Sequence, residues 1–308
     1  MHLQPKVSVC VVTYNQEQYI TQCLQSIVEQ EVDFNFEIIV SDDGSTDNTQ
    51  NIILNFAKKY PSIRPIFHDK NIGALKNFIF AHRQAKGEYV AHIDGDDYIL
   101  PNKLQSQSDY LDSHDEISFA AHAARVIDGN TVIGNSPLYP ELGTIEDLLN
   151  LGTYFINSSI MYRLANEFIH PEDFETVDFY LHVERASKGG VYLDKRILGC
   201  YRDHEQGISK VSAYKKKIEN CYFDAFDRAI DLGVSENVVI PAYLKRKKTF
   251  AFSRYFAGDV LGFQELIFLK KAEVCHASKL HYFLHLSSDT PIYMWLFNKL
   301  RNIKKKFR

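Results

Sequence analysis

The sequence has 308 residues, of which 45% are hydrophobic and 24% are charged. These fractions are close to the averages of globular proteins and exclude a disordered, collagen-like or membrane-embedded chain. The formal net charge of −4 argues against a nucleic-acid partner, although six basic residues gather between Lys299 and Arg308.

The five cysteines predict a reducing environment, because they are odd in number, scattered, and without a CxxC pair or a Cys/His ligand spacing. Residues 1–6 lack the apolar run and cleavage site of a signal peptide, and no apolar run approaches the ~20 residues of a membrane span. We therefore expect a cytoplasmic protein.

The first hundred residues alternate short apolar runs with helical periodicity, a pattern typical of a parallel sheet covered by helices. The predicted strands are 7–12, 36–40, 63–67 and 88–93. Helices are predicted between them, around 20–28, 52–60 and 75–82.

From about Ile117 the pattern changes, and a hairpin at 128–130 predicts that the sheet becomes mixed. A short helix beginning near Thr144, a strand at 157–162, a helix at 176–187 and two strands around Val191 and Leu198 follow. After residue 212 only helical periodicity remains. We therefore predict an α/β catalytic domain over 1–211 and a helical region over 212–308.

Acidic residues stand directly after two predicted parallel strands, at Asp42-Asp43 and at Asp94-Gly95-Asp96-Asp97. Ligands bind outside the carboxyl ends of strands in open α/β sheets, so both groups should face one site. Five carboxylates in one place are costly unless a cation or hydrogen-bond donors compensate. Mg²⁺ or Mn²⁺, held by one or two carboxylates and substrate phosphates, would provide that compensation.

A purely structural interpretation is also open. A single Asp-x-Asp is expected by chance in a chain of this length. Ser45 to Thr49 could simply cap the helix that follows.

Residues 7–15, 42–47 and 94–97, in this order, resemble the family-two inverting glycosyltransferases of the GT-A fold. The resemblance covers about residues 6–210 and implies a central mixed, mostly parallel sheet. It implies a nucleotide-diphosphate sugar donor, most often a UDP sugar, and a Mg²⁺ or Mn²⁺ ion. The residues that it places at the donor or metal are Thr13, Tyr14, Asn15, Asp42, Asp43, Asp94, Gly95 and Asp96, with Asp96 as the direct metal ligand.

Residues 71–77 resemble the family's donor-contacting segment, which includes Gly73, Lys76 and Asn77. The family usually has Arg where Lys76 stands. Lysine can supply a point charge to phosphate but not the bidentate fork of arginine. A solvated helix face is the alternative interpretation of Lys76.

An inverting transferase needs one base to accept the proton of the acceptor hydroxyl. The family places this base at the start of a helix after the mixed strands, often as an acidic pair, and Glu175-Thr176-Val177-Asp178 occupies that stretch. We predict Asp178 as the base. Glu175 remains a competitor because the two acids are not adjacent, and either could simply be a favourable charge in a first helical turn.

Residues 201–209 resemble the segment that closes the family's catalytic domain, where Arg or His can approach the diphosphate or the metal. Arg202 is therefore a candidate for donor binding and His204 for metal binding, with a structural role as the alternative for both. His92, His122 and His182 are predicted to be core or surface residues.

The C-terminal residues 291–308 place apolar side chains on one helical face and basic ones on the rest. This composition is typical of a helix on an anionic membrane surface. The segment could thus hold the protein at the inner face of the cytoplasmic membrane, near a lipid-linked acceptor. A terminal helix packed on its own domain is the alternative.

The sequence thus predicts an inverting glycosyltransferase that moves a sugar to a saccharide or lipid-linked saccharide in bacterial surface polysaccharide or glycolipid assembly, the cellular role resting on family analogy. A metal-dependent nucleotidyltransferase is one alternative, although Tyr14-Asn15-Gln16-Glu17 stands where its phosphate loop belongs. A catalytically inactive nucleotide-sugar-binding protein is the other.

Overall fold

The structure is a computed structural model that describes residues 4–129, 131–137, 139–166, 170, 174–204, 212–268 and 271–287. The chain divides into two compact units, Met1–Tyr222 and Phe223–Arg308. The predicted basic segment 291–308 lies outside the described residues.

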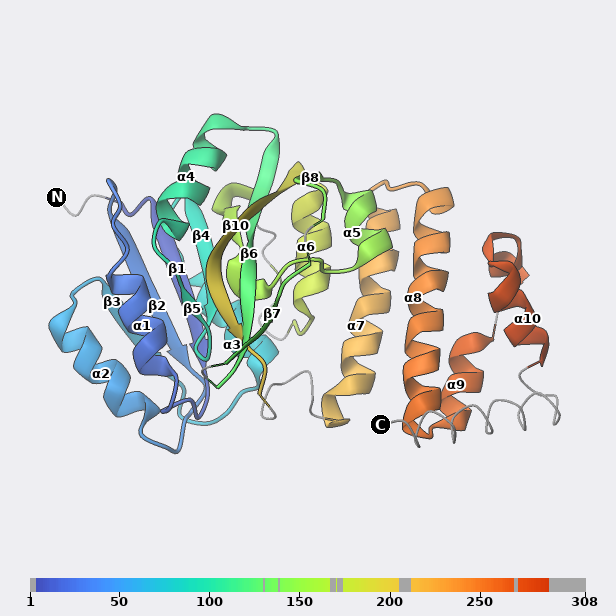
Figure 1. Cartoon of the computed structure of the whole chain (residues 1–308), viewed down its shortest axis with the longest axis horizontal. Helices are drawn as coiled ribbons and strands as arrows, with labels where there is room; N and C mark the ends of the chain where they lie inside the picture. Colours follow the sequence, from blue (N-terminus) through green and yellow to red (C-terminus); the bar gives the residue numbers. More distant parts are fainter. Residues whose placement is uncertain are drawn as a thin grey trace. The chain divides into compact units, whose positions relative to one another are not determined.

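The first unit is built on one sheet with the strand order β3-β2-β1-β4-β9-β6-β10-β5, and β7 and β8 pair with β6 and β10 (Figure 1). Strands β1 to β4 are mutually parallel, and β9 is antiparallel to both β4 and β6. The predicted mixed, mostly parallel sheet is confirmed. The strands are β1 Val7–Thr13, β2 Phe36–Asp42, β3 Ile63–Phe67, β4 Tyr89–Asp94, β5 Tyr98–Ile99, β6 Ile117–Asp128, β7 Thr131–Asn135, β8 Leu142–Gly143, β9 Met161–Arg163 and β10 Gly190–Arg202.

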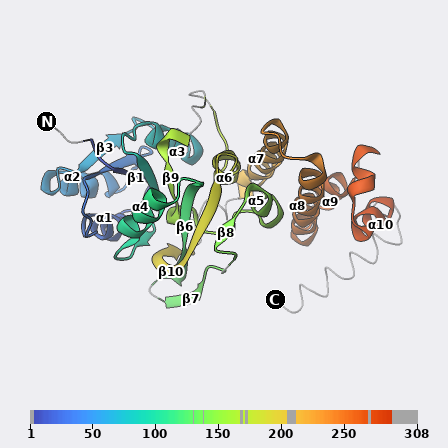
Figure 2. The same cartoon turned by 90° about the horizontal axis from the view of Figure 1, so that it is seen from above.

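Helices cover both faces of this sheet, and the side chains of β1 alternate between the two layers. Val7, Val9 and Val11 pack with α1, α2 and α4, whereas Cys10 packs on the side of α3 and α6. Figure 2 shows α1 and α4 on one side of the strands and α3 on the other. The helices of this unit are α1 Ile20–Val28, α2 Thr49–Lys59, α3 Ala74–Arg83, α4 Lys103–Ser113, α5 Ile145–Leu151 and α6 Asp178–Ala186, and α7 Ser212–Asp231 begins in this unit and ends in the second.

Several local predictions are confirmed by their hydrogen bonds. Thr144 and Asp147 form a capping box at the start of α5, in which each side chain accepts from the backbone of the other. The predicted hairpin joins β6 to β7, with Asp128 opposite Thr131. The local sequence suffices for both features because their partners are three residues apart.

Two predicted strand assignments are wrong in part. Of the strand expected at 157–162 only the end is found, in β9 Met161–Arg163. Residues 157–159 form a short 3-10 turn, η1, because the Ser159 hydroxyl donates to the Ile156 carbonyl at 2.6 Å instead of leaving the backbone to a neighbouring strand. The two strands expected around Val191 and Leu198 are one strand, β10. Register shifts between Asp194 and Ile197 let it stay paired with β6 across a charged stretch.

The described residues of the second unit are helical, which confirms the predicted helical C-terminal region. After α7 come α8 Glu236–Ala257, α9 Val260–Ile267, η4 Lys271–His276 and α10 Lys279–Ser287. Tyr255, Phe263, Ile267 and Leu284 contribute to its core. None of the helices searched in the described part has the length and apolar character needed to cross a bilayer.

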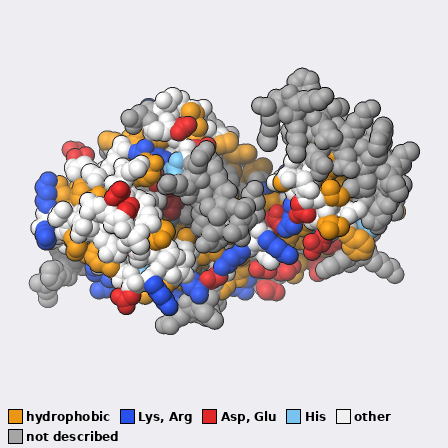
Figure 3. All heavy atoms as spheres, turned by 90° about the horizontal axis from the view of Figure 1, so that it is seen from below, with side chains coloured by type: hydrophobic (Ala, Val, Ile, Leu, Met, Phe, Trp, Pro, Cys, Tyr) orange, Lys and Arg blue, Asp and Glu red, His pale blue; other side chains and the backbone are white. Residues whose placement is uncertain are grey.

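The surface carries charges of both signs. On the face drawn in Figure 3, Lys and Arg side chains lie beside Asp and Glu side chains and among polar and apolar ones.

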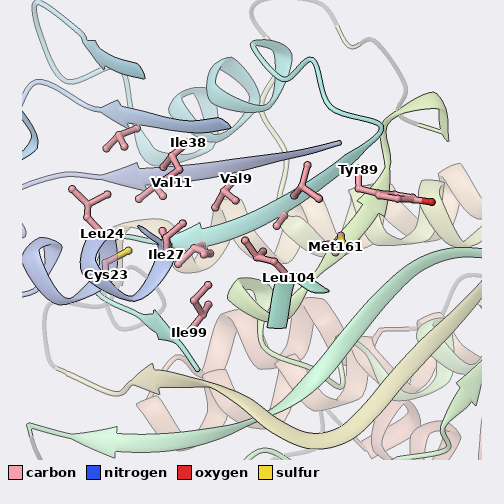
Figure 4. Packing of buried hydrophobic residues seen from close by; sticks show 14 of the residues in the cluster. Val9, Val11, Cys23, Leu24, Ile27, Ile38, Tyr89, Ile99, Leu104 and Met161 are labelled. Atoms are coloured by element: carbon pink, nitrogen blue, oxygen red, sulfur yellow. The ribbon is translucent and has the colours of Figure 1, made fainter. Parts of the chain in front are cut away.

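Leu24 tests the packing of the first layer, because it is fully buried between α1 and the sheet (Figure 4). We expect Leu24→Ala to lower the free energy of unfolding by about 2–5 kcal/mol, since it removes buried methyl groups and leaves a cavity. Leu54→Ala is the matched control on α2, where Leu54 is 40% exposed, and it should change stability by no more than about 0.5 kcal/mol. Urea unfolding followed by circular dichroism measures both, and equal losses would contradict the assigned core.

Candidate active site

Three parallel strands end together at one edge of the sheet. Thr13, the last residue of β1, lies opposite Asp42, the last residue of β2, and Val12 lies opposite Asp94, the last residue of β4. The backbone continues these ladders by one step, since Asp43 N–H donates to the Thr13 carbonyl at 2.9 Å. The two acidic groups therefore arrive on either side of β1.

The Asp42 carboxylate holds the loop that follows β2. It accepts hydrogen bonds from Ser45 N–H at 2.9 Å, from the Ser45 hydroxyl and from Gln50 Nε2 at 2.7 Å. The turn passes through Gly44 at a φ of +72°, where a Cβ would lie 2.7 Å from the Lys70 carbonyl carbon. Asp42 is fully buried. Its contact with the nucleotide base of a donor stays a prediction.

The loops after β1 and β2 are tied to each other. Asn15 N–H donates to Ser45 Oγ at 2.8 Å, and Asn15 Oδ1 accepts from Thr46 N–H at 2.8 Å. Gln16 N–H donates to Thr49 Oγ1 at 2.9 Å. The polar residues before α2 therefore organise the neighbouring loop, which goes beyond capping their own helix. Tyr14, in the first of these loops, is 43% exposed.

Asp43 anchors the segment that leads into α3. Its carboxylate accepts from Ile72 N–H at 2.7 Å and from Gly73 N–H at 3.0 Å, and Gly73 has a φ of +97°, which favours glycine. Burial raises the pKa of Asp43 in spite of these two bonds. Further along α3, Asn77 is buried and bridges to the backbone and hydroxyl of Ser41. Gly73 and Asn77 thus have structural partners.

Asp97 is the structural member of the second acidic group. It accepts from Arg202 N–H at 2.9 Å and from Ser158 Oγ at 2.5 Å, and it is 2% exposed. Burial, together with the negative charges of Asp96 and Asp94, raises the pKa of Asp97 well above its ordinary value. Its role is to close the turn onto β10 and η1.

Asp94 and Asp96 are the more accessible acids of this turn. The side chain of Asp94 is 37% exposed, and its oxygens contact His92 Nε2 and Ser158 Oγ, each at 3.2 Å. Burial opposes ionisation of Asp94, but His92 and the hydrogen bonds outweigh it and lower its pKa. Asp96 Oδ2 lies 2.9 Å from His204 Nε2. Burial, then the charge of Asp94, raises the pKa of Asp96 against the opposing effect of His204.

Arg202 is held away from solvent by aromatic rings. Its guanidinium lies 5.0 Å from the ring centre of Tyr19 and 5.4 Å from that of Tyr98, and it donates to Gln22 and to the Gly129 carbonyl. This arrangement favours the structural interpretation of Arg202.

Glu175 and Asp178 have opposite electrostatic environments. Glu175 forms ion pairs with Lys217 and, at 3.5 Å, with Lys76. The hydrogen bond from Lys217 is the main cause of its lowered pKa. Asp178, the first residue of α6, accepts only from Phe179 N–H among the bonds the described residues make to it, at 2.8 Å.

Burial is the main cause of the raised pKa of Asp178. The hydrogen bond from Phe179 N–H opposes it, and the charge of Asp94 adds to it. His92 and Arg185 have smaller opposite effects. An elevated pKa makes a carboxylate a better proton acceptor, whereas the lysines of Glu175 make it a weaker one. The negative charge that acts on Asp178 comes from Asp94, in the turn formed by residues 94–97, the acidic turn. These observations favour Asp178 over Glu175 as a base. Lys76 is paired with Glu175 in this arrangement.

The side chains available to a cation are the carboxylates of Asp94 and Asp96 and the imidazole of His204. Among the residues searched in the described part, no three His, Cys, Asp or Glu side chains are grouped as a metal site. A protein cage is therefore not preformed there. The donor set nevertheless fits Mg²⁺ or Mn²⁺ held by one or two carboxylates with substrate phosphates as the other ligands.

A family model described as Glycosyl transferase family 2 matches residues 8–168, more than half of the chain. The chain belongs to this family. The match includes β1, β2, β4 and both acidic groups, so the edge of the sheet described above lies inside it.

Relatives of known sequence agree with this membership. An uncharacterised protein of Mycobacterium tuberculosis is 36% identical over 66% of this chain and 60% of that protein. The poly(ribitol-phosphate) beta-N-acetylglucosaminyltransferase TarS of Staphylococcus aureus is 31% identical over 68% of this chain and 37% of TarS. The chain therefore spans less than two thirds of the length of these relatives.

Solved structures of this fold match nearly the whole chain. TarS residues 1–349 of S. aureus in complex with UDP-GlcNAc gives a TM-score of 0.69 at 20% identity, covering 98% of this chain and 91% of that one. A Pyrobaculum calidifontis mannosyltransferase in complex with GDP-Man and Mn²⁺ gives 0.56 at 18% identity, covering 98% and 87%. At these identities the likeness concerns the fold, and it confirms the predicted GT-A architecture.

Two residues that contact the acids of the 94–97 turn were not predicted as site residues. Ser158 contacts both Asp94 and Asp97, and it lies 64 residues beyond Asp94, so no local pattern announces it. His92 was expected in the core or at the surface. It is buried, and its contact with Asp94 follows from their spacing, because residues two apart on a strand share a face.

Gly95 tests how tightly the acidic turn packs on β1. A Cβ at this position would lie 2.5 Å from Gln16 Oε1 and 2.8 Å from Thr13 Cβ. We expect Gly95→Ala to displace the turn and to destabilise the protein by about 1–3 kcal/mol, as overpacking does. Gly134→Ala on β7, where a Cβ meets nothing within 4 Å, is the control. The melting temperatures of both variants measure the effect, and an unchanged Gly95→Ala would contradict the close approach.

Proposed function

We propose that this chain is an inverting glycosyltransferase that moves a sugar from a nucleotide-diphosphate sugar to an acceptor hydroxyl. The observation that supports the proposal is the electrostatic link between Asp94 and Asp178, because the charge of Asp94 contributes to the raised pKa of Asp178. In a member of family 2, two accessible acids suited to a cation, together with one acid suited to accept a proton, support this reaction.

The donor proposed is a UDP sugar. The support is the match to TarS, whose structure was determined with UDP-GlcNAc and has the higher TM-score of the two neighbours described above. Thr13, Tyr14 and Asn15 are proposed to line the nucleotide pocket with Asp42 and Asp43, which shape its loops. Gly95 lets the acidic turn approach Thr13. Four other residues are proposed to act indirectly, by holding in place the segments around the donor. They are Gly73, Lys76, Asn77 and Arg202.

A Mg²⁺ or Mn²⁺ ion is proposed at Asp96 and Asp94, with His204 as a third candidate ligand. When bound, such a cation offsets the negative charge that develops on a departing diphosphate. His204 and Asp96 already contact each other at 2.9 Å, so the imidazole keeps the Asp96 carboxylate in place.

Asp178 is proposed as the base that removes the proton of the acceptor hydroxyl, with Glu175 as the less favoured candidate. Its position at the first turn of α6 fixes the backbone that carries it, and Phe179 N–H orients one oxygen. The acceptor is proposed to be a saccharide or lipid-linked saccharide of a bacterial surface polysaccharide or glycolipid. Residues 291–308 would bring the enzyme to an anionic membrane surface from the cytoplasmic side.

The base is tested with Asp178→Asn. We expect this variant to bind a UDP sugar as the parent does and to lose about 10²–10⁴-fold in kcat, because the amide cannot accept the proton. In the parent, kcat should fall as the pH drops through the raised pKa of Asp178, since the protonated carboxyl is inactive. Glu175→Gln is the matched variant and should keep most of its kcat. The opposite ranking would assign the base to Glu175.

The metal site is tested with Asp96→Ala. Isothermal titration of UDP-GlcNAc with and without MnCl₂ should show a manganese-dependent gain in affinity for the parent and none for the variant. If the affinity of the parent for UDP-GlcNAc changes neither with chelators nor with manganese, the metal is removed from the proposal.

Product analysis separates the alternative reactions. Released UDP indicates sugar transfer, released pyrophosphate indicates nucleotidyl transfer, and binding without turnover indicates a binding protein.

A further inference from the structure

Four side chains form a continuous hydrogen-bonded line that runs from the core to the acidic turn. Tyr162 on β9 contacts His82 Nδ1 at 2.8 Å, and His82 Nε2, on α3, lies 3.0 Å from His92 Nδ1. His92, on β4, then contacts Asp94 Oδ1 through its Nε2 at 3.2 Å. The line ends on one of the two accessible acids of the site.

This line is shielded from water. Tyr162 and His92 are fully buried and His82 is 4% exposed. The ring of Phe78 stacks on His82 at 3.9 Å and lies 4.6 Å from His92. Burial is the main cause that lowers the pKa of His82 well below its ordinary value, so this imidazole is neutral. A neutral imidazole has one donor and one acceptor nitrogen.

When both imidazoles are neutral, only one arrangement of protons makes every bond in the line. The Asp94 carboxylate only accepts, so His92 Nε2 must carry the hydrogen. His92 Nδ1 is then an acceptor, and His82 Nε2 must donate to it. His82 Nδ1 in turn accepts from the Tyr162 hydroxyl. The direction of donation is therefore fixed from Tyr162 outward to Asp94, and His82 determines which tautomer His92 adopts.

We propose that His92 is a positioning residue for Asp94 and that His82 acts through it by holding its Nε2–H tautomer. The inference rests on the proposed function, because it assigns Asp94 to the donor and metal site. Ser158 Oγ contacts the other oxygen of Asp94 at 3.2 Å, so His92 and Ser158 together fix the plane of the carboxylate. Partners that orient a ligating carboxylate set the affinity of the site that it serves.

The role is tested by titrating UDP-GlcNAc in MnCl₂ into the full-length protein. His92→Leu removes the donor to Asp94, and we expect about 10–100-fold weaker binding. His92→Gln should restore most of the affinity, because its amide can donate near the place of Nε2. His82→Leu should also weaken binding, since His92 can then turn its hydrogen to Nδ1. The double variant should lose little more than the larger single loss, because both act through one bond.

His122→Gln is the matched control. His122 is also a buried histidine, 1% exposed, but its Nδ1 contacts only the Ala123 carbonyl at 2.9 Å among the bonds recorded for the described residues. Its replacement should leave the affinity unchanged. If His92→Leu fails to fold, the comparison of His82→Leu with His122→Gln decides the question.

A second readout needs neither metal nor nucleotide. Nitrogen-15 NMR of the metal-free protein should place the proton of His92 on Nε2, and His82→Leu should produce a mixture of tautomers. A proton on Nδ1 in the parent would overturn the line. Normal manganese-dependent binding by His92→Leu would overturn the positioning role alone. A parent that binds no nucleotide sugar would overturn the proposed function, whichever tautomer is found.

Discussion

The site depends on the cost of bringing five carboxylates to one edge of a sheet. A buried carboxylate is stable only where hydrogen-bond donors or a cation compensate for the lost water. Here the donors come from loops, neighbouring strands and helix starts, and Ser158 serves two of the acids. The pairs are Asp42 with Ser45 and Gln50, Asp43 with Ile72 and Gly73, Asp94 with His92 and Ser158, Asp96 with His204, and Asp97 with Arg202 and Ser158.

This distribution separates the acids into two classes. Three acids are nearly or fully buried, Asp42, Asp43 and Asp97. Their carboxylate oxygens accept hydrogen bonds from the segments around them. The side chains of Asp94 and Asp96 are more exposed. The buried acids shape the edge of the sheet, and the accessible ones are available to a ligand. A motif of four residues thus contains both a buried, structural carboxylate and accessible ones.

The same reasoning separates the candidate bases. Lys217 on α7 and Lys76 on α3 stabilise the charged form of Glu175, whereas Asp178 has burial and the negative charge of Asp94 around it. Nothing in the local sequence distinguishes the two acids, because both precede or begin the same helix. The difference arises from residues more than forty positions away.

The sequence by itself determined the parallel strands, their covering helices, the capping box at Thr144 and the two acidic strand ends. These features follow from side-chain periodicity and from contacts a few residues apart, which act before the chain is folded. Tertiary structure alone decided that β10 is continuous and that η1 replaces the first part of a predicted strand. It also decided that Ser158 and His92 contact Asp94, and that His82 contacts His92. Those outcomes depend on which distant residues can satisfy a buried polar group, and only the folded chain brings such residues into reach.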